Sequence, residues 1–374
     1  MRIRKHTSKD HLDTPVVTID LDIMERNISR LAEIARANQI QLRPHIKTHK
    51  IPEIADLQLK AGAVGITCAK IGEAEVMIEK SKATDIFIAY QIVGAEKIRR
   101  LLKLAEHPKL KKLSIGADSV EVAQPISDAA RRRGLKIPVI LKTDVGYPRT
   151  GVRSGQPTLD LARKIEKMPG LKLAGIYTYE GQVYQAKTPR EMRPLALGAC
   201  QRLIETAELL RKSGIAVDTV SVGATPAARF TSKFPGITEL RCGTYIFNDQ
   251  MQLLCGSAKA KDCALTIVAT VVSVPSSDRA VIDAGSKSVT SESVSKFGVF
   301  GLIKGRPDLR FTDANEEHGM LKMVSSRRKL KVGDRLEIIP NHVCPVMNLH
   351  DEAVGIRNGR VECVWAIAAR GKIR

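Results

Sequence analysis

A lysine closes one of the short apolar segments near the start of the chain. In the run Arg43–Thr48, RPHIKT, Lys47 directly follows the apolar segment 41–46. A lysine amine that is partly removed from water has a lowered pKa and can form a Schiff base with a carbonyl compound. With 60 lysines and arginines in the chain, an ordinary surface lysine is the competing interpretation. Lys47 therefore predicts Schiff-base chemistry only if other functional groups converge on it.

Polar or small residues follow several later apolar segments in the same way. They are Arg149 after 137–144, Tyr179 at the end of 171–179, Gly223 and Thr225 after 219–223, and Arg241, Gly243 and Thr244 at the end of 237–242. Glycine N–H groups and threonine hydroxyls in such places can approach a phosphate closely. They predict a phosphorylated ligand. The Tyr179 ring could stack on a flat ligand or be an ordinary rim aromatic.

A second group of candidate ligands stands near the C-terminus. In the run Pro340–Pro345, PNHVCP, His342 and Cys344 are separated by one residue. On an extended segment, residues i and i+2 face the same side, so both side chains could bind one metal ion. Two protein ligands leave coordination positions open, which suits a catalytic metal. Packing in a core is the alternative interpretation.

The elements that must position these residues follow a regular rhythm. Short apolar segments alternate with helical patterns, at 41–46, 64–68, 85–90, 113–117, 137–144, 171–179, 219–223 and 237–242. Strands that alternate with helices form a parallel sheet, and eight such units close a (β/α)8 barrel. We therefore expect an α/β fold with a TIM-like barrel over residues 15–257, whose strands end at one mouth. An open doubly wound sheet is the alternative.

The pattern changes after about residue 258. Period-two alternation and tight turns, including the Asn358-Gly359 hairpin signal, predict a C-terminal antiparallel β domain. This domain would span residues 258–374 together with residues 1–14, and would carry His342 and Cys344. The polar stretch 305–323 predicts a long loop.

Composition narrows the possible partners and compartments. The formal charge is +20, but the basic residues are dispersed and lack interleaved aromatics, so we expect no nucleic-acid partner. The most apolar window, 263–274, is too short to span a membrane. Seven cysteines without a C-x-x-C pair and a charged N-terminus without a signal peptide favour a cytoplasmic protein.

These segments together resemble the fold-type III pyridoxal-phosphate enzymes with an alanine racemase-like N-terminal barrel. Within that group the chain resembles the family of D-threonine aldolases, D-serine dehydratases and D-threo-3-hydroxyaspartate dehydratases. The runs Arg43–Thr48 and Pro340–Pro345 carry the likeness most specifically. It implies pyridoxal 5'-phosphate on Lys47 and a divalent metal, zinc or manganese, on His342 and Cys344.

The same resemblance implies roles for the other residues at the strand ends. Arg149 would lie beside the cofactor phenolate or the substrate, Tyr179 over the cofactor ring, and Arg241 at the pyridine nitrogen, as in alanine racemases. The phosphate would be held by the small residues Gly223, Thr225, Gly243 and Thr244. A homodimer is also expected from the family.

The resemblance implies a lyase that acts on D-configured β-hydroxy amino acids, and leaves its reaction open. The soft ligand Cys344 favours a D-serine or D-threo-3-hydroxyaspartate dehydratase. The segments 149–151 and 179–181 are closer to aldolase-like members and favour a D-threonine aldolase, which we prefer. A racemase needs two bases and no metal, and a non-catalytic pyridoxal-phosphate carrier resembles the barrel alone, so both fit less well.

Overall fold

The computed structural model describes residues 4–324 and 329–374. The chain divides into two compact units, each of which makes most of its residue contacts within itself. The barrel unit comprises residues 29–47, 52–243 and 371–374, and the C-terminal unit comprises residues 1–28, 48–51 and 244–370. This division differs from the boundaries expected from the sequence, which placed residues 15–257 in the barrel.

The barrel unit is built on parallel strands in the order β2-β10-β9-β8-β6-β5-β4-β3. Their bounds are Gln41–Leu42 (β2), Ile66–Cys68 (β3), Asp85–Gln91 (β4), Lys112–Ala117 (β5), Ile137–Asp144 (β6), Leu171–Tyr177 (β8), Thr219–Val222 (β9) and Glu239–Leu240 (β10). A short strand, β7 (Val152–Arg153), pairs with β6. A parallel bridge between His45 and Thr67 links the segments of β2 and β3, so the order returns on itself. All eight predicted segments therefore become strands, and the barrel expectation is confirmed.

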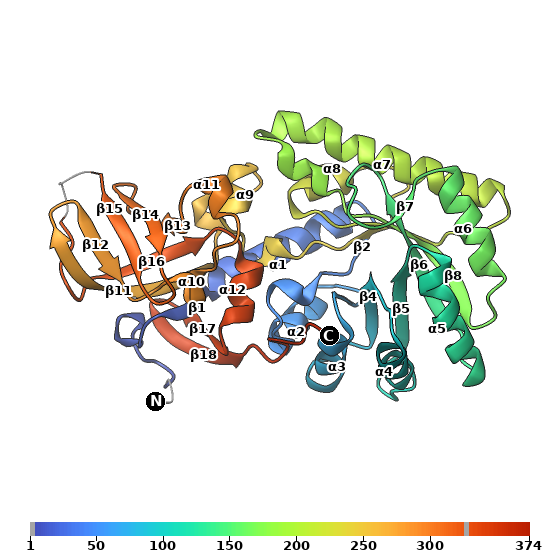
Figure 1. The fold of residues 1–374 in the computed structure, drawn as a ribbon, viewed down its shortest axis with the longest axis horizontal. Coiled ribbons are helices and arrows are strands. Elements are labelled where there is room, and N and C mark those ends of the chain that lie inside the picture. Colours follow the sequence, from blue (N-terminus) through green and yellow to red (C-terminus); the bar gives the residue numbers. More distant parts are fainter. Residues whose placement is uncertain (1–3, 325–328) are drawn as a thin grey trace. The chain divides into compact units, whose positions relative to one another are not determined.

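Helices cover the outer side of these strands, as Figure 1 shows for α4 to α7. The helices of the unit are α2 (Pro52–Lys60), α3 (Ile71–Lys80), α4 (Ala95–Ala105), α5 (Val120–Arg132), α6 (Gln156–Glu166), α7 (Pro189–Lys212) and α8 (Ala228–Thr231). In α4 the buried side chains Ile98, Leu101 and Leu102 recur at helical spacing and pack inward. The Ser119 hydroxyl accepts the Val122 N–H at the start of α5, which satisfies one N-terminal donor.

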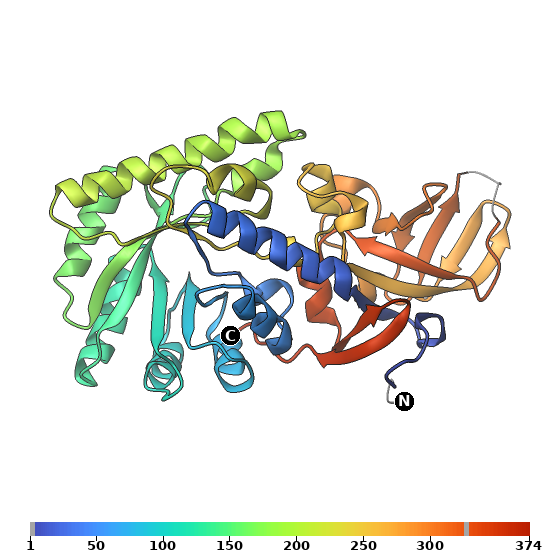
Figure 2. The same cartoon turned by 180° about the vertical axis from the view of Figure 1, so that it is seen from behind.

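The C-terminal unit is a mixed, largely antiparallel sheet. Its strands are β1 (Val16–Asp20), β11 (Leu265–Ser276), β12 (Arg279–Ile282), β13 (Gly301–Ile303), β14 (Leu309–Ala314), β15 (Gly319–Met323), β16 (Arg335–Pro340), β17 (Glu352–Arg357) and β18 (Arg360–Ala366). The short helices α9 (Gln250–Leu254), α10 (Ser286–Val289), α11 (Val294–Phe297) and α12 (Val343–Leu349) accompany them. Figure 2 shows the orange and red strands of this unit from behind. The predicted hairpin at Asn358-Gly359 joins β17 to β18, and both turn residues have positive φ.

Two features of this unit differ from the sequence expectations. The apolar strand β1 pairs antiparallel with β11 and parallel with β17, so it belongs to the C-terminal sheet. An apolar β-branched run suits either sheet, and its pattern does not choose a partner. The predicted loop 305–323 contains the paired strands β14 and β15, whose exposed face carries the polar residues.

The helix α1 (Leu21–Ala37) connects β1 to the first barrel strand along the chain. Among the described residues, no helix is long and apolar enough to cross a membrane. All seven cysteines are free thiols. Five of them are buried, while Cys344 and Cys363 are partly exposed.

Candidate active site

Lys47 lies on the single turn Ile46–Thr48 that follows β2. The backbone before this turn is held to β10 and the residues after it, since the Arg43 N–H donates to the Leu240 carbonyl at 2.9 Å and the His45 N–H to the Cys242 carbonyl at 3.0 Å. The lysine side chain is partly exposed. The structure thus puts Lys47 at the C-terminal end of a barrel strand, the place where barrels of this type carry their chemistry.

The strand that leads to Lys47 is anchored by a buried cluster of charges. Arg43 is 3% exposed. Its Nε donates to Glu239 Oε2 at 2.7 Å, and its Nη1 and Nη2 donate to Asp85 Oδ1 and Oδ2 at 2.6 and 3.0 Å. Burial alone would lower the pKa of Arg43, but the Glu239 and Asp85 carboxylates raise it well above its usual value. Arg43 therefore remains charged and ties β2 to both β10 and β4.

The loop after β6 brings Arg149 to two aromatic rings. Asp144 Oδ1 accepts the N–H groups of Gly146 and Tyr147 at 2.8 and 3.0 Å, which turns the chain sharply. The guanidinium carbon of Arg149 is 4.8 Å from the ring centroid of Tyr179 and 5.6 Å from that of Tyr147. The two rings meet edge to face at 5.6 Å. The predicted pair Arg149 and Tyr179 is thus brought together, and Tyr147 is an unforeseen third member.

Arg241 is buried just beyond β10. Its Nε donates to Ser221 Oγ at 2.7 Å, and its Nη2 donates to the Thr178 carbonyl. The guanidinium carbon lies 4.9 Å from the ring centroid of Tyr177. A Cβ added at Gly223 would lie 3.3 Å from both Nη1 and Nη2. Glycine at this position therefore gives the guanidinium its room.

A second lysine, which was not among the residues expected from the sequence, lies among these groups. Lys142 stands on β6, two residues before Asp144, and is 6% exposed. Its Nζ is 5.1 Å from the Tyr177 ring centroid. Burial, followed by the nearby guanidinium groups of Arg241 and Arg149, lowers the pKa of Lys142 to about 7. A lysine within the apolar run VILKTD was the signal that could have indicated it.

The turn after β9 presents backbone donors to an anionic group. The N–H groups of Gly223 and Ala224 donate to the two oxygens of Glu180, at 3.0 and 3.2 Å. Glu180 is fully buried and was not foreseen as a site residue. Thr225, next along this turn, is partly exposed.

The last two predicted phosphate residues fall on either side of the division between the units. Gly243 is buried at the end of the barrel unit. Thr244 begins the C-terminal unit and opens the single turn Thr244–Ile246.

The geometry predicted for His342 and Cys344 is wrong in one respect. His342 has an extended backbone, but α12 begins at Val343, so Cys344 lies in the first turn of a helix and not on a strand. Pro345 suits this first turn, where its missing N–H costs nothing. Asp249 Oδ2 accepts the Val343 N–H at 3.1 Å and holds the start of the helix. The imidazole of His342 and the thiol of Cys344 nevertheless interact with one another.

Both candidate metal ligands have partners within the C-terminal unit. His342 Nδ1 lies 2.8 Å from Glu292 Oε1, and the Cys344 thiol donates to Thr48 Oγ1 at 3.4 Å. Burial alone lowers the pKa of His342, but Cys344 and Glu292 raise it to about 11. Within residues 4–324 and 329–374, no group of three or more His, Cys, Asp or Glu side chains forms a metal site.

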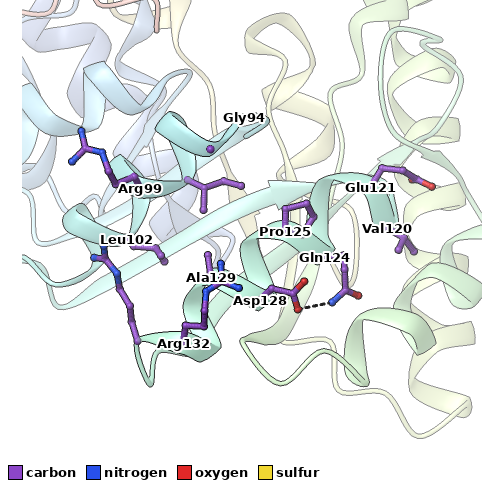
Figure 3. A pocket seen from close by; sticks show the side chains of 13 residues that line it. Gly94, Arg99, Leu102, Val120, Glu121, Gln124, Pro125, Asp128, Ala129 and Arg132 are labelled. Atoms are coloured by element: carbon purple, nitrogen blue, oxygen red, sulfur yellow. Dashed lines mark hydrogen bonds between the residues drawn. The ribbon is translucent and has the colours of Figure 1, made fainter.

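A groove elsewhere on the barrel unit does not coincide with these residues. It lies between α4 and α5, has a volume of about 860 Å³, and is lined by residues such as Ile98, Leu102 and Arg132 (Figure 3). In Figure 3 Gln124 donates to Asp128 across one turn of α5, at 2.9 Å. Its lining includes none of the candidate site residues, so the groove is not the active site.

Comparison with known families matches both units. Residues 19–250 match the alanine racemase N-terminal domain, and residues 264–356 match a putative serine dehydratase domain. The chain is 36% identical to a D-threonine aldolase from an Arthrobacter species over 362 residues, which cover 96% of this chain and 93% of the relative. It is 35% identical to a D-threo-3-hydroxyaspartate dehydratase from a Delftia species, over 89% of this chain and 91% of the relative.

Solved structures agree with these matches. The D-threonine aldolase of Filomicrobium marinum superimposes with a TM-score of 0.93 at 30% identity, and both chains are covered completely. A metal-free D-threo-3-hydroxyaspartate dehydratase, in which a cysteine is replaced by alanine, superimposes with a TM-score of 0.88 at 32% identity over 96% of this chain and 98% of that one. A further variant of that enzyme replaces a histidine two positions before the cysteine. The chain therefore belongs to the fold-type III pyridoxal-phosphate family, with an alanine racemase-type N-terminal domain and a serine dehydratase-type C-terminal domain, and is a lyase of the D-threonine aldolase and D-serine dehydratase group.

Proposed function

We propose that this enzyme is a D-threonine aldolase, which cleaves the Cα–Cβ bond of a D-β-hydroxy amino acid. D-threonine would give glycine and acetaldehyde. The observation that carries the proposal is the match to two D-threonine aldolases along nearly the whole chain, at 36% and 30% identity. The preference for D substrates rests on the same relatives.

The barrel residues fit pyridoxal 5'-phosphate. We propose that the Lys47 amine bonds covalently to the aldehyde carbon of this cofactor. The cofactor phosphate would be held by Gly223, Thr225, Gly243 and Thr244. Support for the phosphate site comes from the position of these small and hydroxyl-bearing residues just after β9 and β10, where donors can approach a phosphate closely. The cofactor would supply an electron sink for the carbanion that forms at Cα.

The remaining barrel residues would orient the cofactor and the substrate. The Tyr179 ring would pack against the cofactor ring, and Arg241 would donate to the pyridine nitrogen. Arg149, which is exposed and rests on two tyrosine rings, would donate to the cofactor phenolate or to the substrate. The concentration of cations at these strand ends, with Lys142 included, favours an anionic cofactor and an amino-acid carboxylate.

The chemistry of His342 and Cys344 fits a divalent metal. Imidazole nitrogen and thiolate sulfur are ligands of zinc, and manganese is the alternative we retain. Glu292 accepts from or donates to the Nδ1 atom of His342, so Nε2 remains to bind the metal. The ion would act as a Lewis acid on the β-hydroxyl of the substrate. In the aldolase reaction a base would remove the hydroxyl proton, the Cα–Cβ bond would break to release the aldehyde, and a proton added at Cα would give glycine.

A dehydratase is the second candidate, and the His-x-Cys pair favours it. The related D-threo-3-hydroxyaspartate dehydratase has a histidine and a cysteine at the same spacing, and its cysteine variant was solved metal-free. In this reaction the Lys47 amine would take the proton from Cα, and hydroxide would leave from Cβ. The elimination would give an imine, and its hydrolysis by water would yield a keto acid and ammonia.

One experiment separates the two reactions. The protein loaded with pyridoxal phosphate and zinc or manganese is incubated with D-threonine and with D-serine, and acetaldehyde, glycine, keto acid and ammonia are measured separately. We expect acetaldehyde and glycine in equal amounts, and their loss with a chelator and in Lys47→Ala. Keto acid and ammonia in their place would establish the dehydratase, and absence of cofactor binding would refute both.

We also propose that the enzyme is a cytoplasmic homodimer. The dimer rests on the family resemblance, and the location rests on the free thiols. Sedimentation of the holoenzyme would measure the oligomeric state, and a monomer would contradict the proposal.

A further inference from the structure

A chain of buried polar side chains runs through the barrel unit towards Arg241. The Arg241 Nε donates to Ser221 Oγ at 2.7 Å, and the Ser221 hydroxyl donates to Glu239 Oε1 at 2.7 Å. Glu239 Oε2 accepts from Arg43 Nε, and Arg43 also binds both oxygens of Asp85. Arg241, Ser221, Glu239 and Arg43 are each at most 5% exposed.

The register of the sheet explains why these side chains meet. Ser221 pairs with Glu239 on the neighbouring strand, and with Tyr177 on its other side. Arg241 lies one residue past β10, where its N–H still donates to the Val222 carbonyl at 2.8 Å. Residues two apart on an extended segment face the same side, so Arg241 lies on the face of Glu239. The long arginine side chain can therefore reach back to Ser221.

Positive and negative side chains alternate along this hydrogen-bonded series. Arg43 is paired with two carboxylates, whereas the two contacts of Arg241 described above are to neutral acceptors, Ser221 Oγ and the Thr178 carbonyl. The Glu239 carboxylate reaches Arg241 through one hydroxyl group. Glu180, which is also buried, contributes a further negative charge from the end of β8.

The contacts of Arg241 fix the plane of its guanidinium. Hydrogen bonds from two different nitrogens restrain rotation of a planar group, and the Tyr177 ring at 4.9 Å supports one side. The guanidinium lies directly against Gly223, because a Cβ added there would be 3.3 Å from both Nη1 and Nη2. The Ser221 hydroxyl thus joins Arg241 Nε to the anchored carboxylate of Glu239.

We propose that Ser221 and Glu239 are positioning residues that hold the Arg241 guanidinium in the orientation it needs to face the cofactor. Ser221 holds Arg241, Glu239 orients the Ser221 hydroxyl, and Arg43 and Asp85 hold Glu239. The part of this inference that concerns the cofactor rests on the proposed function, while the positioning of Arg241 does not.

The test compares two buried serines of the same unit. Ser221→Ala removes the link to Arg241. Ser127→Ala is the matched control, because Ser127 is also fully buried and its hydroxyl accepts one bond, from the Gly170 N–H at 3.1 Å. Ser221→Thr retains the hydroxyl and should restore the function. Glu239→Gln is the second variant in case Ser221→Ala does not fold.

Two readouts are measured on each variant. In the cofactor-free protein, phenylglyoxal labelling followed by mass spectrometry reports how firmly Arg241 is held. In the reconstituted protein, titration with pyridoxal phosphate gives its affinity and its visible absorption band. We expect faster labelling of Arg241 in Ser221→Ala, about tenfold weaker cofactor binding and a shifted band. We expect wild-type values in Ser127→Ala and in Ser221→Thr, and the Ser221→Ala direction in Glu239→Gln.

The outcomes separate this inference from the proposed function. Equal labelling of Arg241 in Ser221→Ala, Ser127→Ala and wild type would overturn the positioning role, whatever the cofactor does. Faster labelling with unchanged cofactor affinity and band would overturn the link from Arg241 to the cofactor. A wild-type protein that binds no pyridoxal phosphate would refute the proposed function, and the labelling would still decide whether Ser221 positions Arg241.

Discussion

Lys142 should make the stability of the cofactor-free protein depend on pH, and replacing it by methionine should remove that dependence. In the native state its pKa is lowered from 10.5 to about 7, first by burial and then by Arg241 and Arg149. Methionine has a similar length and no charge, so it tests the amine and preserves most of the packing. The free energy of unfolding is the quantity to compare.

The direction of this pH dependence follows from the number of protons that Lys142 binds in the native and unfolded states. Between about pH 7 and 10.5 the native protein holds Lys142 neutral, while the unfolded chain keeps it protonated. The unfolded state therefore binds more protons, and the free energy of unfolding rises with pH across this window. Each increase of one pH unit raises the free energy of unfolding by up to about 1.4 kcal/mol, so the rise from pH 7 to pH 9 is on the order of 2 to 3 kcal/mol.

Urea unfolding at pH 7 and pH 9, for wild type and Lys142→Met, measures this difference. Other groups titrate in the same range, but both proteins share them, so the difference between the two proteins isolates Lys142. We expect the stability of Lys142→Met relative to wild type to be greatest at pH 7 and to decline towards pH 9. If both proteins respond to pH in parallel, Lys142 is protonated in the native state at pH 9 and the reasoning from its burial is refuted.

Three further predictions concern Arg43, Glu292 and the proposed metal ion. Arg43→Leu leaves the Glu239 and Asp85 carboxylates without their cation, so urea unfolding should show a loss of about 3 kcal/mol or more; a loss below about 1 kcal/mol would contradict this role. Glu292→Gln should weaken metal binding about tenfold or more, because Glu292 orients His342, and competition with a chromophoric chelator measures it. Wild-type metal affinity in that variant would show that the contact is incidental. Removal of the metal by a chelator should abolish turnover, and added zinc or manganese should restore it; turnover that persists without metal would exclude the metal-assisted mechanism.

Much of the fold could be predicted because it depends on local pattern. Eight apolar segments separated by helical patterns gave the barrel, and alternation with a turn at Asn358-Gly359 gave the β17–β18 hairpin. The partner of β1 could not be predicted in this way, because strand pairing is decided by long-range packing. The hairpin of β14 and β15 was missed because its outward side chains are polar.

For the candidate site residues too, the sequence predicts what depends on local pattern and not what depends on long-range packing. The place of Lys47 after a strand could be predicted, because it depends on the apolar segment directly before it. The helical setting of Cys344 could not, because it depends on Asp249 at the start of α12, almost a hundred positions earlier in the chain. Glu292 could not have been found, since fifty residues of sequence separate it from His342 and nothing in the intervening pattern brings them together.

The sequence by itself determined the kind of protein: the order of strands and helices, the lysine at a strand end and the spaced histidine and cysteine. These follow from periodicity and residue type, which act over a few positions. Only the tertiary structure decided the electrostatics. The lowered pKa of Lys142, and the chain from Asp85 through Arg43, Glu239 and Ser221 to Arg241, require charges from separate strands to be buried together, and burial is a property of the folded molecule.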